Sequence, residues 1–182
     1  MQASLSGAFR AASCGLLAWA ALGAHAQDAK PVKEIKVKLT TSKGEPAGTA
    51  VFKQKKSGVE VKVSLENIPF GDHGVHIHQN AVCEAPDFKS AGGHFNPDGK
   101  QHGFQNEMGH HAGDTPSNVS VGENHQGSAT WLLTAVTLQP GAPNSLLSNG
   151  GTSLIVHEHG DDMKTDPSGN SGNRIACGVI KQ

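Results

Sequence analysis

The chain has 182 residues, with 16 acidic and 15 basic side chains, so its formal net charge is -1 at pH 7 when histidine is neutral. This length suits one domain with a real hydrophobic core, and the charge argues against a general nucleic-acid-binding protein, which would carry a strong basic excess. Glycine is abundant at 23 residues, tyrosine is absent and histidine is frequent at 11. Such a composition favours short strands joined by many turns.

The first 26 residues differ from the rest of the chain. They carry Arg10 and no acidic residue, then the 14-residue apolar stretch AASCGLLAWAALGA, and then the small-residue pattern AHA. This order is typical of a cleaved signal peptide, and the apolar stretch is too short to span a bilayer. We therefore expect residues 1–26 to be a signal peptide and residues 27–182 to be the exported mature domain, with lipid anchoring at Cys14 as a weak alternative.

Removal of the signal peptide leaves two cysteines, Cys83 and Cys177. In an oxidising compartment, an isolated pair most simply forms a disulfide, and two buried free thiols are the alternative. The disulfide would close a loop of about 95 residues, which is worth ~4 kcal/mol of stability in the chain-entropy treatment.

Alternating apolar residues predict a series of short strands with one buried face. Residues 79–117 break this pattern, because they are rich in Gly, Pro, Asp, Asn and His, and a loop of that length is normally functional or disordered. A second polar loop covers residues 160–173. The strands are expected within residues 32–40, 49–56, 59–68, 74–78, 118–136 (a hairpin), 152–159 and 174–180. We therefore predict an all-β antiparallel sandwich or barrel with two long polar loops.

The first polar loop contains the pattern H-x7-H-x8-H-x2-D, formed by His94, His102, His111 and Asp114. Three imidazoles and one carboxylate make a good tetrahedral zinc shell. The loop is therefore a candidate zinc site.

A second group of histidines lies on the predicted strands. His76 and His78 are two residues apart, so both rings point to the same face of a strand. His157 ends the apolar stretch SLIVH beside the second polar loop. Together these three would give a nitrogen-rich site suited to copper, although histidine-rich stretches can also bind metal without any chemistry. We expect His73 to have a structural hydrogen-bonding role, and His25, His110, His125 and His159 to lie outside the metal sites.

Five ordered segments carry a family resemblance: GDHGVHIH, GGHFNPDGKQHG, HHAGD, IVHEHGDD and GNSGNRIACGVI. They resemble the signature blocks of copper/zinc superoxide dismutase, and the match covers about residues 33–182. The position of Cys83 soon after the His-x-His pair resembles the bacterial exported type. The resemblance implies a flattened antiparallel Greek-key β-barrel with an immunoglobulin-like sandwich architecture. It also implies a location in the bacterial periplasm or cell envelope, or secretion.

The resemblance further implies a role for each candidate residue and one copper and one zinc per chain. His94 would bridge the two metals and carry a proton, Asp161 would link His76 with His102, and Arg174 would line the channel to copper. Cys83 and Cys177 would form the family disulfide. The implied copper ligands are His76, His78, His94 and His157, and the implied zinc ligands are His94, His102, His111 and Asp114.

The implied activity is the conversion of two superoxide anions and two protons into oxygen and hydrogen peroxide by alternate reduction and re-oxidation of copper. The alternative is a non-catalytic exported protein that buffers copper and zinc with the same ligands. Arg174 and the glycine-rich approach loop favour the enzyme, because a metal buffer needs neither. The expected partner is superoxide, without nucleic acid or stable membrane insertion. The sequence leaves monomer and homodimer both open.

Overall fold

The computed structural model describes residue 2 and residues 31–182. Apart from Gln2, the predicted signal peptide, with Cys14, lies outside the described residues. Within residues 31–182 the elements are nine strands and two short 3-10 turns. The strands are β1 (Glu34–Thr41), β2 (Pro46–Lys55), β3 (Gly58–Leu65), β4 (Gly71–His73), β5 (Val75–His78), β6 (Val119–Val121), β7 (Gly127–Leu133), β8 (Thr152–His157) and β9 (Arg174–Ile180), and the turns are η1 (Lys89–Ala91) and η2 (Ser148–Gly150).

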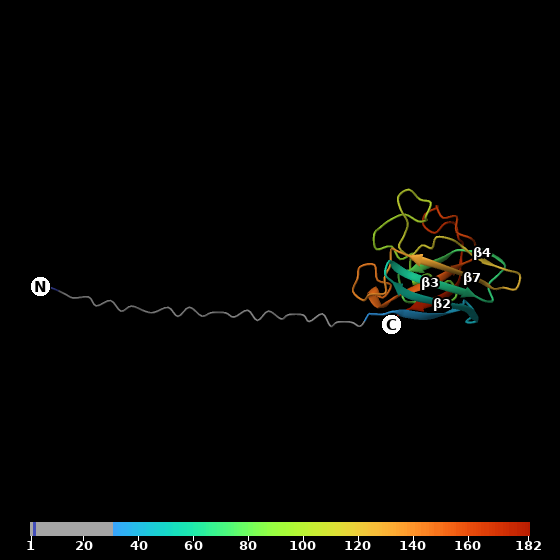
Figure 1. Ribbon diagram of the computed structural model, residues 1–182, viewed down its shortest axis with the longest axis horizontal. Helices are drawn as coiled ribbons and strands as arrows, with labels where there is room; N and C mark the ends of the chain where they lie inside the picture. Colours follow the sequence, from blue (N-terminus) through green and yellow to red (C-terminus); the bar gives the residue numbers. More distant parts are fainter. Residues whose placement is uncertain (1, 3–30) are drawn as a thin grey trace.

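The nine strands form one antiparallel sheet in the order β4-β6-β7-β3-β2-β1-β9-β8-β5. Strands β1 and β9, which come first and last in the sequence, are neighbours in the sheet. Long connections join strands that lie far apart in the sheet, as in a Greek key. The end strands β4 and β5 are separated in sequence only by Gly74, which bonds to the main chain of His157 and His159 at 2.8 and 2.9 Å. The sheet therefore returns on itself as a flattened barrel (Figure 1), which confirms the predicted fold class.

The core follows the alternation seen in the sequence. In β3, Val59, Val61, Val63 and Leu65 are buried, whereas Lys62 between them is exposed. Full burial of one such side chain is worth about 1.5–3 kcal/mol, so this alternation fixes which face of each strand turns inward. The short strand β4 was not predicted as a separate element, because three residues carry no readable period.

The two polar loops leave the barrel on the same side. Figure 1 shows the yellow-green loop of residues near 105 beside the red loop that precedes β9. The main-chain N–H of Gln105 in the first loop donates to the Met163 carbonyl in the second at 2.9 Å. The loops therefore support each other, and the residues that they carry can meet.

Cys83 and Cys177 form a disulfide across 94 residues, with a Cα–Cα distance of 5.8 Å. This confirms the predicted pairing and shows that the free-thiol alternative is wrong. The bond lies in a small buried cluster with Phe88, Ala91 and Ile155. It fastens the start of the first polar loop to β9.

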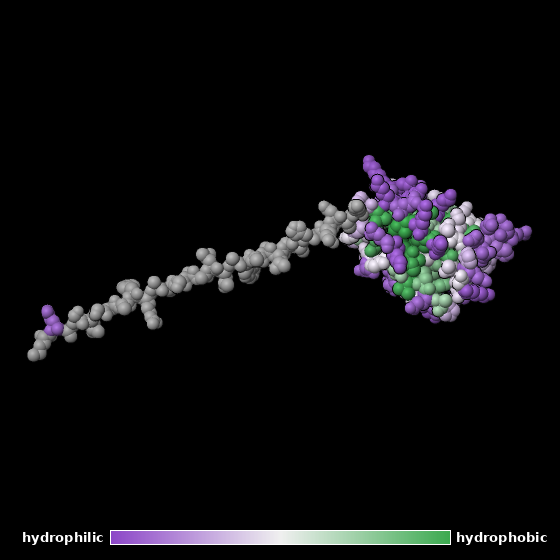
Figure 2. All heavy atoms as spheres, turned by 90° about the horizontal axis from the view of Figure 1, so that it is seen from below, coloured by the Kyte–Doolittle hydropathy of each residue, from purple (hydrophilic) through white to green (hydrophobic). Residues whose placement is uncertain are grey.

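The surface is mostly polar. On the face in Figure 2, hydrophilic residues surround a central band of apolar residues. Among the described residues, no helix is long and apolar enough to cross a membrane.

Candidate metal centre

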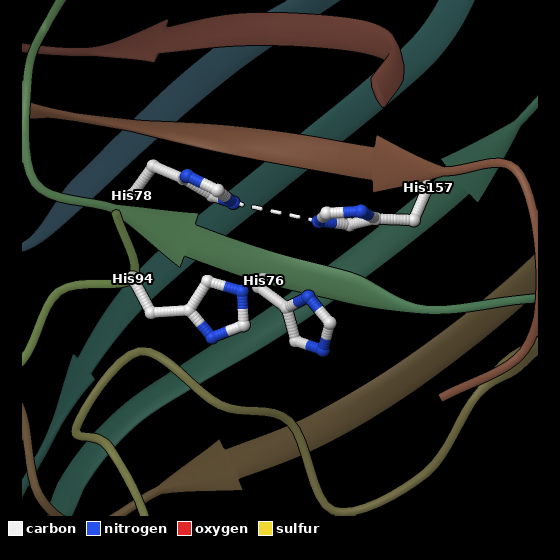
Figure 3. Close-up of side chains that lie close together, drawn as sticks. All are labelled: His76, His78, His94 and His157. Carbon is white, nitrogen blue, oxygen red and sulfur yellow. Dashed lines mark hydrogen bonds between the residues drawn. The ribbon is translucent and has the colours of Figure 1, made fainter. Parts of the chain in front are cut away.

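Three histidines on β5 and β8 converge with His94 on one point, and we call these four residues the strand-borne group: His76, His78, His94 and His157. His76 and His78 lie on β5, which pairs with β8 so that Val75 faces Val156, and His157 ends β8. The His78 and His157 rings approach each other, with 3.4 Å between their Nε2 atoms (Figure 3). The ring of His94 lies 4.2 Å from that of His76, centroid to centroid. All four rings are buried.

His94 reaches this point because its loop pairs with β5. The Phe95 N–H donates to the Ile77 carbonyl and the Ile77 N–H donates to the Gly113 carbonyl, both at 2.8 Å. A Cβ on Gly113 would overlap the Ile77 carbonyl oxygen, so this approach requires glycine. The pairing places His94 beside His78 and delivers Asp114 to the same side.

Hydrogen bonds orient the outer nitrogens of these rings. His76 Nε2 donates to Asp161 Oδ2 at 2.8 Å, and His78 Nδ1 donates to the Gly92 carbonyl at 2.9 Å. The inner His76 Nδ1 is buried without a hydrogen-bond partner, and so is His94 Nε2. An unpaired buried polar atom costs about 1–3 kcal/mol, and a metal ion would remove this cost. The donor atoms of His76, His78, His94 and His157 lie within 4.8 Å of one another, so these residues fit a nitrogen-ligated metal.

The second group of donors, which we call the loop-borne group, gathers around one carboxylate oxygen. It consists of His94, His102, His111 and Asp114. Asp114 Oδ1 accepts hydrogen bonds from the Nδ1 atoms of His94, His102 and His111 at 2.8, 3.1 and 3.2 Å. Asp114 Oδ2 accepts the Gly103 N–H at 2.9 Å and the His111 N–H at 3.0 Å. Three imidazole nitrogens and one carboxylate oxygen facing one point are the donor set that zinc prefers. The four donors again lie within 4.8 Å of one another.

Asp161 links the two groups. Its carboxylate accepts from His76 Nε2 at 2.8 Å and from His102 Nε2 at 3.0 Å. The Met163 N–H donates to its Oδ1 at 2.6 Å. A Cβ on Gly169 would overlap that same oxygen. One carboxylate on the second polar loop therefore orients a ring of each group, a common arrangement around ligating histidines.

The two groups differ in charge. Burial, followed by the like charge of His76, lowers the pKa of His94 to about 3. Burial also holds the pKa values of His78 and His157 well below the ordinary histidine value. For His102, burial acts in the opposite sense, but its hydrogen bonds to Asp114 and Asp161 win and raise the pKa to about 9. Burial would raise the pKa of Asp114, yet its hydrogen bonds to His102 and His111 hold it far below its usual range.

Arg174 lies beside the strand-borne group. Its Nη1 and Nη2 donate to the carbonyls of Phe88 and Gly92, both at 2.7 Å. It lines an open cavity of about 360 Å³ together with His78, His94 and His157. The guanidinium therefore fixes the carbonyl that orients His78 and also presents a positive charge to this cavity.

Two residues of the site were missed by sequence reasoning. The Asn118 side chain bonds to the main chain of Asp161, and Asp166 Oδ1 accepts the His102 N–H at 2.7 Å. Asp166 Oδ1 also lies 4.0 Å from His111 Nε2. These partners are 43 and 64 residues apart in sequence, and no spacing rule connects them.

Four described histidines, His73, His110, His125 and His159, belong to neither group, and His25 lies outside the described residues. The buried His73 bonds through Nδ1 to the His157 carbonyl and through Nε2 to the Pro69 carbonyl, both at 2.8 Å. His110, His125 and His159 belong to none of the clustered metal-donor groups of the described residues.

Comparison with known proteins identifies relatives over most of the chain. The family model described as copper/zinc superoxide dismutase (SODC) matches residues 46–180. A protein named copper/zinc superoxide dismutase 1 from Aquifex aeolicus is 46% identical over 144 residues, which are 79% of this chain and 85% of that protein. A solved superoxide dismutase-like protein from Bacillus subtilis has a TM-score of 0.76 and 39% identity, covering 80% of this chain and 97% of that one. The Cu/Zn superoxide dismutase from Brucella abortus has a TM-score of 0.65 and 30% identity, covering 81% and 99%.

Proposed function

The chain belongs to the copper/zinc superoxide dismutase family, and from this premise we propose that its metal centre converts superoxide into oxygen and hydrogen peroxide. The observation that carries the proposal is the pair of buried, unpartnered nitrogens on His76 and His94. They belong to donor groups that are complete for two metals of different preference.

We assign copper to the strand-borne group and zinc to the loop-borne group, one of each per chain. His94 belongs to both, because its Nε2 is free on one side and its Nδ1 faces Asp114 on the other. The proposed copper ligands are His76, His78, His94 and His157, and the proposed zinc ligands are His94, His102, His111 and Asp114.

Bound copper supplies the one-electron redox chemistry, and bound zinc supplies a fixed positive charge without redox change. The protein itself must manage protons, because two superoxide anions consume two protons as they become oxygen and hydrogen peroxide. His94 is suited to this task, since its Nε2 is buried beside the cavity without a hydrogen-bond partner and could hold a proton whenever it is not bound to copper. Asp161 keeps the His76 and His102 rings oriented while the His94 proton moves.

Arg174 provides the positive charge that an anionic substrate requires. The chain carries more acidic than basic residues, so its total charge does not attract superoxide. A local cation at the cavity mouth can raise the association rate, and superoxide dismutase is an established example of such steering.

A copper and zinc buffer without turnover is the competing function, and the same ligands would serve it. One relative is named only superoxide dismutase-like, but several others are named copper/zinc superoxide dismutases, and these favour the enzyme. The open cavity beside the strand-borne group and the guanidinium at its mouth favour the enzyme.

We expect the protein to be exported to the periplasm or cell envelope after removal of residues 1–26. Mass spectrometry of the mature protein tests this, because its N-terminus should be Gln27.

For a homodimer, the apolar band in Figure 2 is the kind of surface that a second subunit covers. Light scattering during gel filtration distinguishes a dimer from a monomer.

Superoxide decay after pulse radiolysis tests the activity. Residues 27–182, loaded with one equivalent each of copper and zinc, should accelerate the decay in proportion to their concentration. His157→Ala, which retains the proposed zinc ligands, should not. A fully loaded wild-type protein that leaves the decay rate unchanged would establish the buffering function instead.

A further inference from the structure

Asn118 makes an unusual pair of hydrogen bonds. It directly precedes β6 and is partly buried. Its Oδ1 accepts the main-chain N–H of Asp161 at 2.7 Å, and its Nδ2 donates to the main-chain carbonyl of Asp161 at 3.0 Å. One side-chain amide thus satisfies both polar main-chain groups of a residue 43 positions away.

The two ends of this contact differ in their support. Asn118 adjoins β6, whose first residue, Val119, is buried and pairs with His73 in the barrel. Asp161 lies on the second polar loop, outside every strand, and follows Gly160. A Cβ on Gly160 would lie 3.2 Å from Asn118 Nδ2, so the loop packs closely against this amide. The contact therefore fastens a loop residue to the barrel.

Asp161 contacts one histidine ring of each metal group. Its carboxylate meets the outer nitrogens of His76 and His102 at 2.8 and 3.0 Å. Hydrogen bonds of that length leave little room for displacement of the main chain that carries the carboxylate. An unanchored Asp161 would lose the geometry that orients the two rings.

We propose that Asn118 is a positioning residue for both metal sites, acting through the main chain of Asp161. The inference rests on the metal sites assigned under the proposed function. It adds that the stability of those sites is set in part by a residue that touches neither a metal nor a ligand.

The two metals should respond unequally to loss of Asn118. His76 lies on β5, which β8 and the paired loop segment hold on both sides. His102 lies on the first polar loop, and its ring is hydrogen-bonded to the carboxylates of Asp114 and Asp161. Mutation of partners that orient metal ligands typically costs 10–100-fold in affinity. We expect Asn118→Ala to weaken zinc binding about 10-fold and copper binding by a smaller factor.

Two further variants separate positioning from general stability. Asn118→Asp keeps an acceptor for the Asp161 N–H but cannot donate to the Asp161 carbonyl, so its zinc affinity should be intermediate. Asn144→Ala is the matched control. Asn144 is also partly buried, and its Nδ2 also donates to a main-chain carbonyl, that of Ala135, at 2.9 Å. It has no hydrogen bond to either metal group.

The experiment measures zinc affinity by chelator competition and the visible spectrum of Co²⁺ bound in place of zinc. Asn118→Ala should show the weaker affinity and a changed Co²⁺ spectrum, and Asn118→Asp should fall between it and the wild type. Asn144→Ala should match the wild type in both measurements even if its thermal stability falls. If Asn118→Ala does not fold, an altered affinity and spectrum in Asn118→Asp decide in the same way.

Equal zinc affinity and identical Co²⁺ spectra in the Asn118 variants and Asn144→Ala would overturn this inference alone. A wild-type protein that binds no zinc would overturn the assigned zinc site, and this inference with it.

Discussion

The two donor groups share His94 but are built in different ways. The strand-borne group, called the copper-side group because copper is proposed to bind there, contains nitrogen donors only, and three of its four histidines lie on β5 and β8. The loop-borne group, called the zinc-side group because zinc is proposed to bind there, lies on a long loop and is organised around the Asp114 carboxylate. One group is therefore positioned by strand pairing, and the other by hydrogen bonds to a buried charge.

This difference has consequences for the metal-free protein. Burial keeps His78, His94 and His157 neutral near pH 7, so their nitrogens are ready to bind a metal. In the zinc-side group, carboxylates favour the protonated form of His102, whose pKa rises to about 9. A metal must displace that proton. The barrel thus preforms the strand-borne site. In the loop-borne site, a proton on His102 occupies a position that a bound metal would take.

Removing one ligand from each group should separate the two proposed metal sites most strongly. His157→Ala should lower copper affinity by more than about 100-fold, beyond the usual loss for partners that only orient ligands, and leave zinc bound. Asp114→Ala should do the reverse. Metal analysis after dialysis against equal free copper and zinc measures both. Loss of the same metal in both variants would mean that the ligand assignment is wrong.

The disulfide supports the copper side through the segment that carries Gly92. Cys177→Ser should lower the free energy of unfolding by about 4 kcal/mol, because a cross-link over 94 residues strongly restricts the unfolded chain. Urea denaturation of the metal-free protein measures this. Chemically reduced wild type is the control and should lose the same amount. A loss below about 1 kcal/mol would show that the cross-link contributes little.

Arg174 has two roles on the copper side, and two variants separate them. Arg174→Lys keeps the positive charge but not the paired hydrogen bonds to Phe88 and Gly92. Arg174→Gln removes the charge. If steering dominates, the Gln variant should lose about 10-fold in rate and most of its salt dependence, whereas the Lys variant should stay close to wild type. Equal loss in both variants would assign Arg174 to loop fastening alone.

The pH dependence of zinc binding gives the most specific test of the difference between the two groups. The pKa of His102 is raised in the folded protein, so its proton is retained below about pH 9 and must leave when zinc binds. Zinc affinity should therefore rise by up to about 10-fold per pH unit towards pH 9. Calorimetry at pH 7 in two buffers should show release of about one proton with zinc and almost none with copper, each metal added alone. Similar proton release for both would remove the electrostatic contrast between the groups.

The strands and the clustering of the candidate donor side chains could be predicted from the sequence because their signals are local. Alternation in β3 placed Val61 and Val63 inside the barrel, and the two-residue spacing placed His76 and His78 on one face. The spacing of donors on the first polar loop indicates a zinc shell without any information on the path of the loop. The linking role of Asp161 came from family resemblance, since nothing in its local sequence indicates it.

Other features depend on how distant loops close, and local patterns do not encode them. Asn118 and Asp166 meet their partners only after the two polar loops fold side by side. The double attachment of Arg174 to Phe88 and Gly92 likewise requires the segment after Cys83 to fold back onto β9. Such contacts are set by the complete fold.

Anomalous diffraction from crystals of the protein loaded with both metals tests the central contrast most directly. Data collected at the copper and zinc absorption edges should place copper among His76, His78 and His157, and zinc among His102, His111 and Asp114. Both ions should contact the His94 ring. Zinc in both positions, an exchange of the two metals, or one peak only would contradict a nitrogen-only copper site paired with a carboxylate-centred zinc site.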